Sequence, residues 1–165
     1  MTHRVSQKSH SILWAPWRKT YILRVSKKKR CVFCAAWAER NDKKNKIIKR
    51  SKHAFAILNT YPYNNGHIMV IPNRHVAGFE HLSDGELLDL MRLQNAIIAL
   101  LKRRMKPHGF NVGVNLGRSA GAGVVGHVHI HILPRWIGDT NFMPMVARAK
   151  VISESLASLY ERLTK

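Results

Sequence analysis

Short apolar or alternating stretches recur along this 165-residue chain. Alternation with a period of two is typical of half-buried β-strands, because successive side chains of a strand point to opposite faces of a sheet. The pattern predicts strands over residues 47–48, 53–58, 67–71, 110–116 and 126–135. Pro134 is expected to end the last strand, since proline lacks the N–H that the ladder needs.

A helical period replaces this alternation in the middle of the chain. Ser83 and Glu86 have the spacing of a capping box, which marks the start of a helix. Apolar residues then recur at every third or fourth position until Pro107 ends the run. We predict a long core helix over residues 83–106. A terminal amphipathic helix is predicted over about residues 146–163.

Composition sets the class of protein. The chain is 45% apolar, which is ordinary for one globular domain with a core of its own. No stretch is long and apolar enough to span a bilayer, so we expect no membrane partner. The N-terminus lacks the apolar segment of a secretory signal, and two nearby cysteines are not a disulfide framework. A cytoplasmic location is the expectation.

Positive charge is concentrated at one end of the chain. Residues 1–52 hold 16 Lys and Arg against 2 acidic residues, and the formal net charge of the whole chain is +19. Such runs attract polyanions, including nucleic acid. No nucleic-acid-binding motif accompanies them, so we interpret residues 1–30 as a basic arm with a solvated surface. Within this arm, the aromatic residues 14–22 are expected to dock on their own domain or on a second subunit.

Three histidines alternate with β-branched residues near residue 130. On a strand, His127, His129 and His131 would share one face, and the intervening apolar residues would point into a core. Three imidazoles make poor structural filler, because each needs a hydrogen-bond partner once it is desolvated. They suit nucleophilic or acid–base chemistry near neutral pH, or metal ligation.

Two other stretches carry candidate chemistry. Cys31 and Cys34 form a Cys-x-x-Cys pair, which would give a metal two thiolates and leave two ligands to come from elsewhere. A redox pair and simple packing remain alternatives for these cysteines. The glycine-rich residues 117–123 lie just before the histidines, where backbone amides can approach the oxygens of a phosphate.

The histidine stretch resembles the motif of the histidine triad superfamily, a group of nucleotide-binding hydrolases and transferases. The match consists of His127, Val128, His129, Ile130, His131, Ile132 and Leu133. Supporting matches are Val32-Phe33-Cys34, Ile57-Leu58-Asn59, residues 66–72, Arg74-His75 and Asn115. The flanking residues 14–18 and 134–142 look like the bacterial branch that includes diadenosine tetraphosphate phosphorylases.

This resemblance implies an α+β fold whose antiparallel sheet continues across a homodimer, in a histidine triad domain over residues 31–165. It also implies that His129 attacks the α-phosphorus of a nucleotide and forms a nucleotidyl-histidine intermediate. The phosphates would be contacted by His131, His67, Asn115 and the loop residues Gly121, Ala122 and Gly123. The base and ribose would be contacted by Val32, Phe33, Leu58 and Asn59, of which the apolar three are otherwise ordinary core.

A structural zinc follows from the same resemblance. The implied ligands are Cys31, Cys34, His75 and His127, with His53 as a competing third ligand. Many family members carry Gln and then Ser or Thr shortly before the triad. In this chain residues 122–125 read Ala-Gly-Val-Val and carry no such side chain. Backbone amides or Ser119 would therefore have to contact the leaving group.

The expected function is cleavage of dinucleoside polyphosphates such as diadenosine tetraphosphate, with phosphorolysis slightly preferred over hydrolysis. The alternatives are hydrolysis of adenosine phosphoramidates and a non-catalytic nucleotide sensor. The family resemblance also implies that the capped helix over residues 83–106 and the strand that begins at Phe110 form the dimer interface.

Overall fold

The structure is a computed structural model that describes residues 30–139 and 152–165. Residues 1–29 of the predicted basic arm, with its aromatic segment, lie outside the described residues, as do residues 140–151. The described elements follow in the order α2 (Val32–Glu39), α3 (Asp42–Asn45), β1 (Ile47–Arg50), β2 (Ala54–Leu58), β3 (Ile68–Pro72), η1 (Phe79–His81), α4 (Asp84–Met105), β4 (Gly109–Val114), β5 (Ile130–Arg135) and α6 (Leu156–Thr164).

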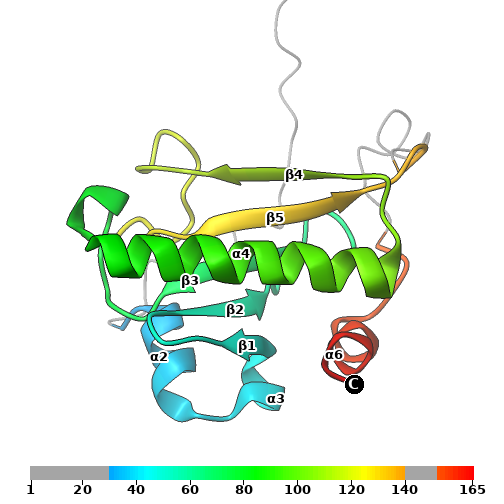
Figure 1. Cartoon of the computed structure of the whole chain (residues 1–165), viewed down its shortest axis with the longest axis horizontal. Helices are drawn as coiled ribbons and strands as arrows, with labels where there is room; N and C mark the ends of the chain where they lie inside the picture. Colours follow the sequence, from blue (N-terminus) through cyan, green and yellow to red (C-terminus); the bar gives the residue numbers. More distant parts are fainter. Residues whose placement is uncertain (1–29, 140–151) are drawn as a thin grey trace, which may run out of the picture.

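The five strands form one antiparallel sheet in the order β1-β2-β3-β5-β4. Helix α4 runs along one face of this sheet, and α2 and α3 lie at the β1 end of the sheet (Figure 1). The predicted α+β class with an antiparallel sheet, a long capped helix and a C-terminal helix is therefore confirmed.

Apolar side chains pack on both faces of the sheet. On the α4 face, one core gathers alternate strand residues such as Ala56, Val70 and Ile132 against α4 and α6. On the opposite face, a smaller core gathers the residues between them, among which are Phe55 and Met69, against α2. The triad histidines belong to this second face, since His127 and His129 contact Phe33 of α2 edge-on.

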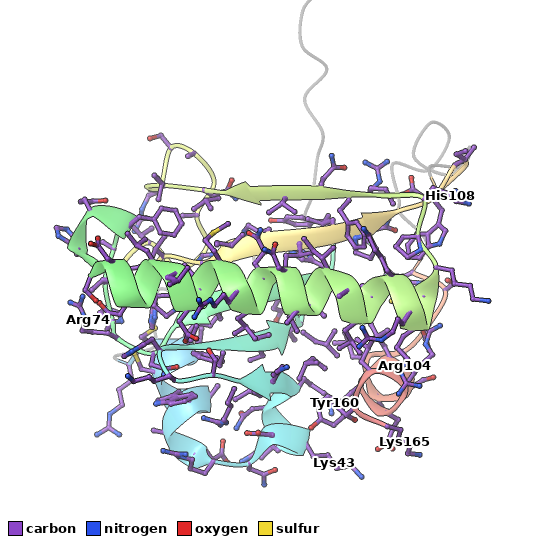
Figure 2. All side chains as sticks on the ribbon, in the orientation of Figure 1. Lys43, Arg74, Arg104, His108, Tyr160 and Lys165 are labelled. Carbon is purple, nitrogen blue, oxygen red and sulfur yellow. The ribbon has the colours of Figure 1, made fainter. Side chains whose placement is uncertain are left out.

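Helix α4 begins and ends as the sequence predicts. The Ser83 hydroxyl accepts a hydrogen bond from the Glu86 amide, and the Glu86 carboxylate accepts one from the Ser83 amide, which completes the capping box. Lys106, in the left-handed conformation, caps the other end. Figure 2 shows Arg74 at the start of α4, where it pairs with Glu86, and Arg104 near its end. The basic residues in the last turn of α4 offset the negative end of the helix dipole.

Three sequence predictions about the elements are wrong. Pro134 does not end the strand, because β5 continues to Arg135 and Pro134 pairs with Phe110 of β4. At that point β5 has no second neighbour, since its pairing with β3 covers only residues 130–132. The missing N–H therefore breaks no ladder.

The other two errors concern where elements start. The histidine strand begins at Ile130 rather than at residue 126, because the Val128 amide donates to the Val76 carbonyl in the loop after β3. Helix α6 begins at Leu156 with Ser155 as its N-cap, so residues 152–155 of the predicted helix are not helical, and its residues 146–151 lie outside the described residues.

Candidate active site and metal centre

Cys31, Cys34, His75 and His127 converge at the N-terminal end of α2. One ligand atom from each lies within 4.8 Å of all the others. Nδ1 of His127 lies 3.3 Å from Sγ of Cys31 and 3.2 Å from Nδ1 of His75, and Sγ of Cys34 lies 3.3 Å from Nδ1 of His75. We call this set the Cys–His cluster.

The spacing of the Cys–His cluster fits a tetrahedral zinc ion. Bonds of about 2.3 Å to sulfur and about 2.0 Å to nitrogen place tetrahedral ligand atoms roughly 3.3–3.8 Å apart. A set of four protein ligands leaves no open position, which is typical of a structural rather than a catalytic metal. His53, the competing ligand, is not part of the cluster.

Groups next to the Cys–His cluster set the protonation of its ligand atoms. Nε2 of His127 lies 2.9 Å from the carbonyl oxygen of Pro72, so this nitrogen carries the proton and donates it, and the lone pair of Nδ1 faces the sulfur atoms. Burial, together with the neighbouring Cys31, raises the pKa of the Cys34 thiol to about 11. The thiol is therefore protonated at neutral pH, and binding of a metal would release that proton.

His129 lies next to this cluster but has a different hydrogen bond. Its Nδ1 donates to the carbonyl oxygen of His127 at 2.8 Å, which leaves the lone pair on Nε2. The side chain is 4% exposed, and burial lowers its pKa. His129 is therefore a neutral imidazole with a fixed tautomer at neutral pH, as a nucleophile requires.

His131 and His67 form the next part of the site. Nε2 of His67 lies 2.8 Å from Nδ1 of His131, and the backbone amide of Tyr63 donates to Nδ1 of His67 at 3.1 Å. Because Nδ1 of His67 accepts, its Nε2 carries the proton and donates to His131. The proton of neutral His131 then resides on its own Nε2. His67, His129 and His131 together are called the imidazole row below.

Burial keeps the imidazole row uncharged. Desolvation, followed by the nearby His131 and His129, lowers the pKa of His67 to about 3. Desolvation and the nearby His129 lower the pKa of His131 to about 4. His67 is 1% exposed, and in this structure its Nε2 is used by the hydrogen bond to His131.

Asn59 fixes the far end of this chain of hydrogen bonds. Its Oδ1 accepts from the Tyr61 amide at 2.9 Å, and its Nδ2 donates to Nδ1 of His67 at 3.2 Å. Asn59, the residue predicted to bind the ribose, therefore orients His67 in this structure.

The predicted base-binding residues separate into two groups. Val32 and Phe33 lie on the histidine face, where the Phe33 ring centroid is 5.1 Å from that of His129. Leu58 is 1% exposed and packs in the core on the opposite, α4 face of the sheet. The side chain of Leu58 is therefore not beside the imidazoles.

The glycine-rich loop uses two of its three predicted phosphate-binding amides internally. The Gly121 amide donates to the Arg118 carbonyl at 3.0 Å, and the Ala122 amide donates to the Gly117 carbonyl at 3.2 Å. Gly123 has no hydrogen-bond acceptor for its amide among residues 30–139 and 152–165. The loop as described offers an anion the Gly123 amide rather than a nest of three.

A groove of about 260 Å³ opens beside His131, along β4. Asn115, predicted to contact phosphate, lines this groove together with Tyr63, Asn111, Gly113, His131 and Leu133. We call it the β4 groove.

Sequence reasoning missed Tyr63, although an aromatic residue in a turn just before a histidine is a signal that could have been followed. It also missed the Pro72 carbonyl, because no side-chain pattern marks a backbone acceptor.

A family model described as the HIT domain matches residues 40–136 of the chain. The chain belongs to the HIT, or histidine triad, family. It is 40% identical to a Mycobacterium tuberculosis protein named AP-4-A phosphorylase, in a match that covers 87% of this chain and 77% of that one.

Two further relatives extend the comparison. This HIT-family chain is 32% identical to the asymmetrical bis(5'-nucleosyl)-tetraphosphatase of Schizosaccharomyces pombe, over 70% of this chain and 64% of that one. Its fold matches that of a zinc-bound histidine triad family protein from Mycobacterium smegmatis with a TM-score of 0.65, at 22% identity, over 81% of this chain and 90% of that one. Within residues 30–139 and 152–165, no helix has the length and apolar character needed to cross a membrane.

Proposed function

We propose that this HIT-family protein cleaves dinucleoside polyphosphates, with diadenosine tetraphosphate as the preferred substrate, through a nucleotidyl intermediate on His129. The observation that carries the proposal is the hydrogen bond from Nδ1 of His129 to the His127 carbonyl. It leaves the lone pair on Nε2 of a buried, neutral imidazole on the histidine face of the sheet. The relatives named above support the class of substrate.

In the first step, the Nε2 lone pair of His129 forms a bond to the α-phosphorus, and the bond from that phosphorus to the bridging oxygen breaks. The leaving nucleoside polyphosphate departs with the bonding electrons. Nδ1 keeps its proton and its hydrogen bond to the His127 carbonyl, which stabilises the positive charge that develops on the ring.

His131 would hold the phosphate that is attacked. Its Nε2 proton can donate to a non-bridging oxygen, and His67 and Asn59 keep that proton on Nε2 by satisfying the other ring nitrogens in turn. The pKa values of about 3 and about 4 mean that His67 and His131 act as neutral donors rather than as cations. Asn115 and the Gly123 amide are the remaining candidate phosphate contacts, and Val32 and Phe33 the candidate base contacts.

Zinc is the proposed resident metal of the Cys–His cluster, where it would supply structural cross-linking rather than reaction chemistry. The cluster shares His127 with the site, since the carbonyl of this residue orients His129. Cys31, Cys34 and His75 would complete the coordination.

The acceptor in the second step determines the overall reaction. Orthophosphate attacking the nucleotidyl-histidine gives ADP, whereas water gives AMP. We favour orthophosphate, because the relative with 40% identity is named a phosphorylase. Hydrolysis is the second candidate, because the loop over residues 117–123 uses two amides internally and so has less to offer a second anion.

One chromatogram tests the proposal. Diadenosine tetraphosphate is digested by purified protein with and without orthophosphate. We expect faster consumption with orthophosphate and ADP as a product. Equal consumption with AMP as the product would replace phosphorolysis by hydrolysis. Binding of the substrate without any turnover would favour a nucleotide sensor and overturn the proposed enzyme.

A homodimer is part of the same proposal. The exposed apolar residues Leu88 and Met91 lie on α4, and β4 forms an edge of the sheet, so both can face a second copy. Pairing of β4 with its own copy would make a continuous sheet. Light scattering should give a dimer mass for the natural chain and a monomer mass for a Leu88→Glu, Met91→Glu double variant. A monomer mass for the natural chain would exclude the dimer.

A further inference from the structure

The β4 groove contains open volume next to His131. The sheet register pairs Gly113 of β4 with His131 and Asn111 with Leu133, so these residues lie side by side on the histidine face. A Cβ placed on Gly113 would meet nothing within 4 Å. Glycine inside a strand weakens the strand, and it often marks a place where a ligand approaches closely.

The lining of the groove is uncharged and partly aromatic. Neither an acidic side chain nor a lysine or arginine is among its lining residues. Tyr63 forms one wall and is 48% exposed, with its ring centroid 4.9 Å from that of His67 and 6.0 Å from that of His131. Asn115 adds an amide group, and Asn111 adds its Nδ2, because the Oδ1 of Asn111 accepts a hydrogen bond from Arg135, whose charge is paired with Asp139. An aromatic wall with amides suits a nucleobase and its ribose, whereas a phosphate would require positive charge or several free amides.

The size and place of the groove narrow its ligand further. Its volume of about 260 Å³ lies just below the roughly 300–1,000 Å³ of ligand pockets, so its size suits one nucleoside better than a whole dinucleotide. It extends along β4 from Asn111 to Asn115, and His131, the proposed phosphate contact, is paired with Gly113 in the middle of this stretch. The groove therefore lies where the departing half of a substrate held at His129 can extend.

We infer that the β4 groove binds the nucleoside of the leaving half of the substrate, with Tyr63 as the stacking surface and Gly113 as the floor. The inference rests on the proposed function and adds a reason for preferring dinucleotides to mononucleotides. The proposed dimer is compatible with it, because strands that pair edge to edge keep both faces of the sheet open.

Two substrates separate the inference from the proposed function. Diadenosine tetraphosphate has a nucleoside in its leaving half, and adenosine 5′-phosphoramidate has none. Both are assayed at saturating orthophosphate, and the readout is the ratio of the kcat/KM values for the dinucleotide and the mononucleotide. Gly113→Leu fills the floor of the groove. Gly109→Leu is the matched control, because Gly109 lies on the same strand, also has open space around its Cβ position and does not line the groove.

We expect Gly113→Leu to lower the ratio about tenfold or more, by raising KM for the dinucleotide, and Gly109→Leu to leave it unchanged. Tyr63→Ala should lower the ratio to a similar extent, and Tyr63→Phe should restore it, because stacking needs the ring and not the hydroxyl. An unchanged ratio in Gly113→Leu, or equal losses on both substrates, would overturn the inference.

Oligomeric state gives the remaining outcome. If Gly113→Leu, but not the control Gly109→Leu on the same strand, shifted the mass in light scattering, the groove would be a contact between copies, and the inference would be overturned. If the natural chain turned over neither substrate, the proposed function itself would fail, which is a different result from an unchanged ratio.

Discussion

His127 of the Cys–His cluster and His129 of the imidazole row lie two residues apart, but they carry the proton on opposite ring nitrogens. His127 donates from Nε2 to the Pro72 carbonyl and turns Nδ1 toward the two sulfur atoms. His129, two residues later, donates from Nδ1 to the His127 carbonyl and keeps Nε2 as its lone pair. In each case a backbone carbonyl selects the tautomer. The difference teaches that the roles of His127 and His129 are set by the nitrogen that a carbonyl occupies, and not by the motif alone.

The largest expected effect separates the two regions by activity. His129→Ala removes the proposed nucleophile, so turnover of diadenosine tetraphosphate should fall at least about 10³-fold. The Cys–His cluster keeps all its ligands in this variant, so zinc content and a cooperative melting transition should remain. Residual turnover of a tenth or more of the natural rate would remove His129 from the nucleophile's role. The measurements are the rate of turnover of diadenosine tetraphosphate and the zinc content by elemental analysis.

A change in the Cys–His cluster is expected to remove the metal and to lower stability. Cys34→Ala should lose about one zinc per chain and lower the free energy of unfolding by about 3 kcal/mol or more, because metal binding is coupled to folding. His53→Ala is the matched control and should keep the metal, since His53 is outside the cluster. Elemental analysis and melting curves with and without chelator measure this. A natural chain that holds no zinc and melts unchanged with chelator would mean that the cysteines only pack.

Phe33 joins the two regions and gives a smaller effect. It lies between the two cysteines in sequence, is 5% exposed, and contacts the rings of His127 and His129 edge-on. Replacing it by leucine removes contacts worth about 1 kcal/mol, so kcat should fall about threefold to tenfold while zinc remains bound. If zinc were lost in proportion to kcat, the effect would belong to the metal site and not to the position of His129.

The expected effect that is smallest at neutral pH is a dependence of stability on pH, and it belongs to the imidazole row. The pKa of His67 is about 3 in the folded protein and near 6.5 when the chain is unfolded, so the unfolded state binds a proton more readily. This contribution to stability is present above pH 6.5 and is lost as the pH falls toward 3. In His67→Gln this titrating group is absent. Between pH 6.5 and pH 3 the free energy of unfolding should therefore fall less steeply than it does in the natural chain. Chemical denaturation at a series of pH values tests this, and parallel curves would contradict it.

Sequence reasoning recovered what local patterns encode. The capping box of α4 and the alternation of the triad histidines with core residues both follow from spacing alone, and the structure confirms them. The four members of the Cys–His cluster were implied by the family resemblance, and they lie together.

The remaining features depend on partners that are distant in the sequence. The start of β5 is set by a hydrogen bond from Val128 to Val76, and the tautomers are set by the carbonyls of Pro72 and His127. The face on which Leu58 lies follows from strand register, which spacing did not fix. The β4 groove exists because Gly113 is paired with His131 across two strands.

The central claim is that His129, and no other imidazole of the row, carries the nucleotidyl group. Its most direct test is peptide mass spectrometry of the protein after brief mixing with diadenosine tetraphosphate without orthophosphate, followed by quenching in alkali, in which phosphorus–nitrogen bonds survive. The account predicts an added AMP group on His129 that disappears when orthophosphate is supplied. An adduct on His131, or continuing turnover with no adduct on any histidine, would contradict it.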